Sequence, residues 1–173
     1  MINGFDKFEA AFLPYRDSFI LIGGTSVQMV LGQYNSPKGV ASRARVTHDI
    51  DLLIVTERIS DAFKSAFHKF MTDGEYECYC SNERPHYYRF LNDKQNCYPE
   101  KVELLSHSLL DFPNIRHTPL VLERDESMSA MVLDENLYQY ALAHCEERQS
   151  ISSPTLATDP TPLIDAYNRL FEL

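Results

Sequence analysis

The 173-residue sequence contains no apolar run that approaches the roughly 20 residues of a membrane-spanning helix. Its N-terminal segment, Met1–Asp6, also lacks the basic and apolar regions of a secretory signal peptide. Both absences argue against membrane insertion and export. We therefore expect a cytoplasmic protein that has no membrane partner.

Basic residues are scarce in this chain. Lys and Arg together number 16 against 25 Asp and Glu, which gives a formal net charge of −9. Broad nucleic-acid-binding faces depend on clustered Lys and Arg, so the composition argues against such a face, although it leaves room for a local basic groove. Carboxylates that bind metal would add to the negative count, because a bound cation offsets part of it.

The four cysteines lack the paired Cys-x-x-Cys spacing that is typical of a zinc site. Cys78 and Cys80 would share one face of a strand, with His86 and Cys97 nearby in sequence, so a metal cluster there is one interpretation. The other is that they are free thiols, which commonly behave as small buried hydrophobic residues. Disulfides are not expected in a cytosolic protein.

Hydrophobic periodicity and turn residues predict one α/β (α+β) domain, with a mixed β-sheet flanked by helices. This domain covers residues 1–149, and residues 150–173 are expected to form a proline-containing linker and a C-terminal helix, 163–171, packed on it. The helices expected within the domain are 5–14, 25–33, a helix from an N-cap at Ser60 to Met71, and 134–147. The expected strands are 19–22, 49–55, 75–80, 86–91, 101–106 and a short one at 120–122.

A glycine turn is the first motif that carries chemistry. Gly23, Gly24, Thr25 and Ser26 follow the apolar run 19–22 and open the helix expected at 25–33. A strand that turns into a helix N-terminus presents free backbone N–H groups and the positive end of the helix dipole, which together favour a phosphate. The alternative for Thr25 and Ser26 is that each is an ordinary helix cap.

A pair of aspartates is the second motif. Asp49 and Asp51 alternate with apolar residues in the strand expected at 49–55, which places both carboxylates on one face, about 7 Å apart at Cα. Such a pair can converge on a hard cation such as Mg²⁺ or Mn²⁺. The alternative is an edge-strand face that points to water.

A third carboxylate would complete a two-metal site. Glu103 stands alone as an acid in the apolar strand 101–106, and its alternative interpretation is a solvent-facing residue paired with Lys101. If Glu103 adjoins Asp49 and Asp51, repulsion between like charges should raise the pKa of at least one of them until a cation binds. Arg45, just before the aspartate strand, could reach a triphosphate as a bidentate donor; its alternative is a solvated loop.

These residues together resemble the nucleotidyltransferase fold of the DNA polymerase β superfamily. That family's pattern is a hydrophobic residue with Gly-Gly or Gly-Ser, then acid–hydrophobic–acid, then a third acid in a later strand. Ile22–Gly24, Asp49–Asp51 and Val102–Leu104 follow it in order. The string Arg45–Leu52 and the segment Ser129–Asp134 also resemble the bacterial branch that includes the AbiEii-like toxins of type IV toxin–antitoxin systems.

The resemblance implies an enzyme that transfers a nucleoside monophosphate from an NTP to an acceptor hydroxyl, phosphate or nucleotide end. It assigns Mg²⁺ or Mn²⁺ to Asp49, Asp51 and Glu103, proton removal from the acceptor to Glu103, and the phosphates to residues 23–26. The acceptor is left open among protein, small molecule and RNA, and a cognate antitoxin is an expected partner. An antibiotic-modifying nucleotidyltransferase and a non-catalytic nucleotide-binding module are the alternatives.

The chain also departs from the pattern of the family that it resembles. Where many members of that family carry a lysine in a late helix, this sequence has Leu163-Ile164-Asp165-Ala166. Many members also continue into a helical domain that binds the acceptor, so a minimal, truncated or partnered form is among the expectations.

Overall fold

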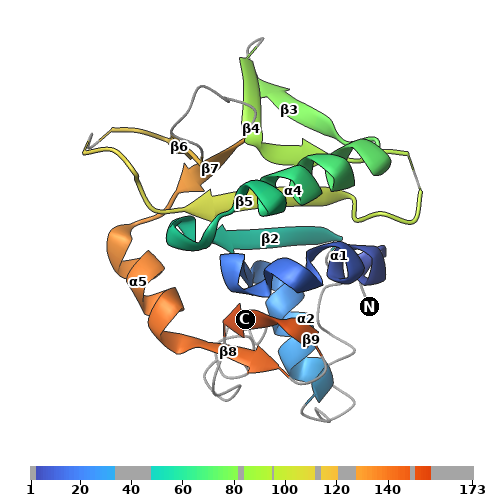
Figure 1. Ribbon diagram of the computed structural model, residues 1–173, viewed down its shortest axis with the longest axis horizontal. Helices are drawn as coiled ribbons and strands as arrows, with labels where there is room; N and C mark the ends of the chain where they lie inside the picture. Colours follow the sequence, from blue (N-terminus) through green and yellow to red (C-terminus); the bar gives the residue numbers. More distant parts are fainter. Residues whose placement is uncertain are drawn as a thin grey trace, which may run out of the picture.

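The computed structural model describes residues 3–33, 48–81, 84–94, 96–111, 114–120, 128–148 and 151–156 (Figure 1). Within these ranges the chain forms a mixed β-sheet flanked by helices, which confirms the fold class expected from the sequence. The α-helices are α1 (Phe5–Phe12), α2 (Gly23–Gln33), α4 (Asp61–Asp73) and α5 (Glu135–His144), and short 3₁₀ helices are η1 (Leu13–Ser18) and η2 (Thr56–Arg58). None of the helices in this part of the chain combines the length and apolar character needed to cross a membrane.

The centre of the sheet is formed by three strands, β1 (Phe19–Ile22), β2 (Asp49–Ile54) and β5 (Lys101–Ser106). β2 runs antiparallel to β1 and parallel to β5. The sheet order over the described residues is β3-β4-β5-β2-β1-β9-β8, with β7 paired to both β5 and β6. The outer strands are β3 (Glu77–Ser81), β4 (Arg84–Leu91), β6 (His117–Pro119), β7 (Ser129–Val132), β8 (Cys145–Arg148) and β9 (Ile151–Leu156).

Two different strands share one edge of β5. β4 pairs with its first half, Lys101 to Glu103, in antiparallel orientation, and β7 pairs with its last two residues, Leu105 and Ser106, in parallel. The opposite edge of β5 pairs with β2. The first half of β5 therefore lies between β2 and β4, and side chains from all three strands meet on the same face of the sheet.

The period-2 alternation of strand residues divides the core into two layers. On one face, phenylalanines of α1 and α4 pack on Leu21, Ile50, Leu52 and Leu104, and the ring of Phe70 contacts those of Phe8 and Phe12 edge to face. On the other face, α5 contributes Tyr138 and Ala141 to a smaller cluster with strand residues. Because Asp49, Asp51 and Leu53 alternate with Ile50 and Leu52, the two aspartates face the same side as this smaller cluster.

Most expected elements near the site are confirmed. Strands form at 19–22, 49–54 and 101–106, and Ser60 caps α4 by accepting a hydrogen bond from the backbone N–H of Phe63 at 3.1 Å. The helix expected at 5–14 ends at Phe12 and continues as the 3₁₀ helix η1. In place of the strand expected at 120–122, β6 ends at Pro119 and Leu120 follows it, while residues 121 and 122 lie outside the described residues.

Two expectations in the C-terminal third are wrong. The helix expected to run to residue 147 ends at His144, and 145–148 form β8; residues 151–156, expected as linker, form β9. β9 pairs with the edge of β1 and satisfies backbone groups that this edge would otherwise expose, and β8 in turn pairs with the outer edge of β9. β7, which the sequence analysis did not anticipate, covers the end of β5. The helix expected at 163–171 lies outside the described residues.

Candidate active site

Three acids from two neighbouring strands meet on one face of the sheet. The parallel register of β2 and β5 places Asp51 directly opposite Glu103 and Asp49 opposite Lys101. Burial, together with the charge of Glu103, raises the pKa of Asp51 from 3.8 to about 6. The sequence predicted that repulsion between adjacent acids would raise the pKa of at least one of them. The acids are adjacent, but burial contributes more to the raised pKa of Asp51 than the charge of Glu103 does.

Two basic side chains hold the acid cluster together. Lys101 Nζ lies 3.0 Å from Asp49 Oδ2 and 2.8 Å from Glu103 Oε2, and Arg89 Nε on β4 donates to Glu103 Oε1. Burial alone would raise the pKa of Glu103, but the hydrogen bonds from Lys101 and Arg89 outweigh it and hold that pKa below its ordinary value. Burial likewise opposes the charge on Lys101, yet its two carboxylate partners raise its pKa.

The sequence analysis named Lys101 only as an alternative partner of Glu103 and did not identify Arg89. Spacing within β5 indicates that Lys101 and Glu103 share a face, because they are two residues apart. The position of Arg89 depends on the antiparallel register that places it opposite Glu103, and no local pattern encodes that register.

Gly23 forms the wall of the site next to Asp51. Its φ of +67° lies in the left-handed region that favours glycine, and a Cβ at this position would stand 2.2 Å from Asp51 Oδ2. The β1–β2 register places Ile22 opposite Asp51, so the chain turns into α2 directly beside this carboxylate. The structure thus brings the glycine turn and the acid cluster together.

The hydroxyls of the glycine turn bind backbone carbonyls of the protein itself. Thr25 Oγ1 donates to the Asp49 carbonyl oxygen, which fixes the first turn of α2 to the start of β2. Ser26 Oγ donates to the Gly23 carbonyl oxygen at 3.0 Å, and both side chains are buried. In this conformation the hydroxyls position the turn, and its backbone N–H groups are the better candidates for contact with a phosphate.

A cleft of about 620 Å³ borders the acid cluster through Asp49 and Lys101. Its lining is mostly polar and contains three carboxylates but one ammonium group. The remaining lining residues come from the N-terminal segment, the last residue of β4 and the connection between β4 and β5: Asn3, Leu91, Asn92, Asp93, Asn96, Tyr98 and Glu100. The cleft therefore offers space for a polar ligand beside Asp49.

The remaining sequence candidates fall outside this cluster. Arg45 lies outside the described residues. The cysteines Cys78, Cys80 and Cys97 are free thiols. In the part of the chain that the structure describes, no group of three or more His, Cys, Asp or Glu side chains is arranged to hold a metal ion. The acid cluster supplies suitable oxygen donors, but two of its three carboxylates are bound to Lys101 and Arg89.

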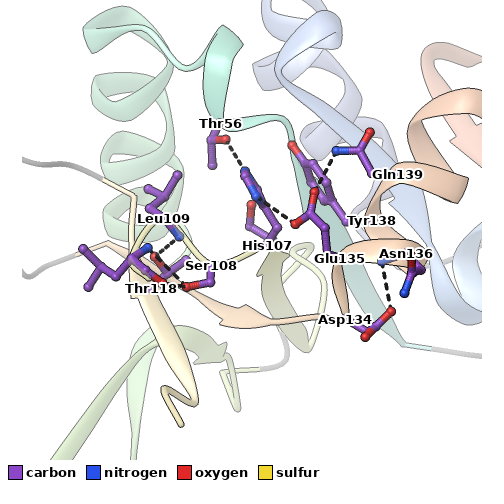
Figure 2. Close-up of polar contacts among 12 residues, drawn as sticks. Thr56, His107, Ser108, Leu109, Thr118, Asp134, Glu135, Asn136, Tyr138 and Gln139 are labelled. Carbon is purple, nitrogen blue, oxygen red and sulfur yellow. Dashed lines mark hydrogen bonds and ion pairs between the residues drawn. The ribbon is translucent and has the colours of Figure 1, made fainter. Parts of the chain in front are cut away.

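A second polar cluster lies at the opposite ends of β2 and β5 (Figure 2). His107 Nε2 is 3.0 Å from Thr56 Oγ1 and its Nδ1 is 3.2 Å from Glu135 Oε2. The imidazole stacks on Tyr138, with ring centroids 4.3 Å apart. These contacts connect the start of α5 to the residues that follow both strands, so this cluster holds α5 on the sheet.

The chain matches no protein-family model, no curated protein and no solved structure. A functional proposal therefore depends on its residues and their geometry. The chemically distinctive part of that geometry is a cluster of three acids beside the Gly23 turn, one of which, Asp49, lines a polar cleft. Carboxylate oxygens are the donors that a hard divalent cation prefers, and a helix N-terminus beside them suits a phosphate.

Proposed function

We propose that this protein is a metal-dependent nucleotidyltransferase, which moves a nucleoside monophosphate from an NTP to an acceptor hydroxyl or nucleotide end. The observation that carries the proposal is the meeting of Asp49, Asp51 and Glu103 on one face, beside the Gly23 turn. The aspartates and Glu103 come from two separate parts of the sequence, and the resemblance to nucleotidyltransferases identified the same three acids together with the same turn.

Each part of the site has a role in this proposal. Asp49, Asp51 and Glu103 supply the oxygen ligands for Mg²⁺ or Mn²⁺, and the ion, when bound, neutralises charge on the triphosphate and on the reacting oxygens. The first turn of α2 contributes backbone N–H groups to the phosphates. Gly23 allows the backbone to approach that region, since any side chain there would meet the Asp51 carboxylate.

The charge of the cleft bears on the acceptor. Its lining carries the carboxylates of Asp49, Asp93 and Glu100 and the ammonium group of Lys101, so negative charges outnumber positive ones. This matches the acidic balance of the whole chain. As an acceptor surface, such a lining favours a neutral or cationic group that carries a hydroxyl over a long polyanion such as RNA. This favours a protein or small-molecule acceptor, as in an antibiotic-modifying enzyme, over RNA. The toxin role and the cognate antitoxin stay predictions from the resemblance.

A non-catalytic nucleotide-binding module is the second candidate. It is favoured by the ion pairs of Lys101 and Arg89, which engage both oxygens of Glu103 and one oxygen of Asp49. A site stabilised in this way could hold its shape and still lack turnover.

Labelled NTPs distinguish the two candidates. The purified protein, incubated with each α-labelled NTP, Mg²⁺ or Mn²⁺ and a cell lysate, should transfer label to a discrete product, and Asp49→Ala/Asp51→Ala should abolish the transfer. Asp61→Ala/Asp73→Ala removes the same charge from exposed ion pairs on α4 and should retain it. A wild-type protein that binds NTP but yields no labelled product with either metal would support the binding module.

A further inference from the structure

Lys101 lies inside the acid cluster and contacts the carboxylates of both strands. Its ammonium is within hydrogen-bond distance of Asp49 Oδ2 and Glu103 Oε2, at 3.0 and 2.8 Å. The side chain is 26% exposed and also lines the cleft. A single positive charge therefore stands between two of the three carboxylates that the proposed function assigns to a divalent cation.

A metal ion bound at this site needs the same oxygen atoms. Arg89 engages Oε1 of Glu103 while Lys101 engages Oε2, so both oxygens of this carboxylate already have a cationic partner. A cation that bridges Asp49 and Glu103 must displace the ammonium from at least one of them. Repulsion between the ammonium and a divalent ion adds to this cost, because both would lie among the same carboxylates.

We infer that Lys101 is a positioning residue that competes with the divalent cation for Asp49 and Glu103 and thereby weakens the binding of metal alone. The inference rests on the proposed function, since it takes these carboxylates as the metal ligands. A metal ion that arrives with a triphosphate meets less opposition, because the triphosphate offers the displaced ammonium a negative partner. The lysine has a flexible four-carbon stem that lets its ammonium leave the carboxylates and stay within the cleft. Lys101 thus makes metal binding depend on nucleotide.

The test measures binding of Mn²⁺ alone, by the loss of the free-ion signal in electron paramagnetic resonance. Lys101→Met should bind Mn²⁺ at least about fivefold more tightly than the wild type, which is the lower end of typical couplings between two ligands. Lys69→Met is the matched control: it removes the same charge from an exposed pair with Asp73 on α4 and should leave the affinity unchanged. A lysine with a merely structural role would not increase the affinity when it is removed.

A second measurement uses the wild-type protein and stands even if Lys101→Met does not fold. Acetylation of each lysine by a short pulse of reagent is read by mass spectrometry, with EDTA and with saturating Mn²⁺. Displacement from two carboxylates should increase the acetylation of Lys101 relative to Lys69. Unchanged acetylation at saturating Mn²⁺ overturns the inference.

The outcomes separate this inference from the proposed function. Equal or weaker Mn²⁺ binding by folded Lys101→Met overturns the competition and leaves the nucleotidyltransferase proposal standing. If neither the wild type nor Lys101→Met binds Mn²⁺ but the wild type still forms a labelled product from NTP, the competition by Lys101 is overturned and the nucleotidyltransferase proposal stands. If neither binds Mn²⁺ and no labelled product forms, both proposals fail.

Discussion

Asp51 is predicted to destabilise the metal-free protein at neutral pH, so that Asp51→Asn should increase its stability. Burial and the neighbouring Glu103 raise the pKa of this carboxyl to about 6 in the folded state, whereas its ordinary value is 3.8. The folded protein therefore binds this proton more tightly than the unfolded chain does. Asparagine resembles the protonated carboxyl in shape and carries no charge, and it should remove the cost of ionisation.

The direction of the pH dependence follows from these two values. Below about pH 3.8 the carboxyl is protonated in both states and the charge costs nothing. As the pH rises from there to about 6, only the unfolded chain ionises, so the wild type loses stability relative to the variant. Above about pH 6 the difference in free energy of unfolding between Asp51→Asn and the wild type is constant. Its upper limit is about 3 kcal/mol, and we expect about 1–2 kcal/mol because Asp51 retains contact with solvent.

Urea unfolding in EDTA, followed by circular dichroism at closely spaced pH values from 3.5 to 8, measures this difference. Subtracting the wild-type curve from the Asp51→Asn curve cancels the titration of other groups. Asp73→Asn is the control, since Asp73 pairs with Lys69 on the surface and its removal should change stability by less than about 1 kcal/mol. An Asp51→Asn protein that is less stable than the wild type at pH 7, or whose advantage does not grow between pH 4 and 6, would refute the reasoning.

Three further substitutions test the packing around the site by urea unfolding. Gly23→Ala should lower the free energy of unfolding by at least about 1–2 kcal/mol, because alanine is strained at a φ of +67° and its Cβ meets Asp51. Gly24→Ala should leave the free energy of unfolding nearly unchanged. Equal effects of the two substitutions would contradict the role of Gly23. His107→Ala should lower the free energy of unfolding by about 1–3 kcal/mol through lost hydrogen bonds and ring stacking. An effect near zero would contradict the role of His107 in holding α5 on the sheet. Phe67→Ala should lower the free energy of unfolding by about 3–5 kcal/mol, because the ring of Phe67 is fully buried in the core between α4 and the sheet. A decrease below about 1 kcal/mol would contradict this packing.

The parts of the site that the sequence could predict are those that depend on local pattern. Alternation in residues 49–54 correctly places Asp49 and Asp51 on one face, opposite to Ile50 and Leu52. The glycines at the start of α2 could be recognised as a turn because an apolar strand precedes them. The register that aligns Asp51 with Glu103 could not be derived in this way, since it depends on the packing of β2 against β5, about fifty residues apart in sequence.

The elements that the sequence analysis missed are those in which tertiary pairing overrides local preference. β9 contains Pro154, which is unfavourable within a sheet, yet the strand forms between β1 and β8. Residues 145–148 continue a helical pattern but pair with β9 as β8. Arg89 belongs to the same class, because only the pairing of β4 with β5 brings it to Glu103.

Thermal unfolding with nucleotide tests the central claim most directly, because a ligand that binds the folded state raises the melting temperature. The wild-type protein should melt several degrees higher with millimolar Mg²⁺ and at least one NTP, and Asp49→Ala/Asp51→Ala should lose this increase while Asp61→Ala/Asp73→Ala retains it. No increase with any NTP and either Mg²⁺ or Mn²⁺, or an increase that persists without Asp49 and Asp51, would contradict a nucleotide site at the acid cluster.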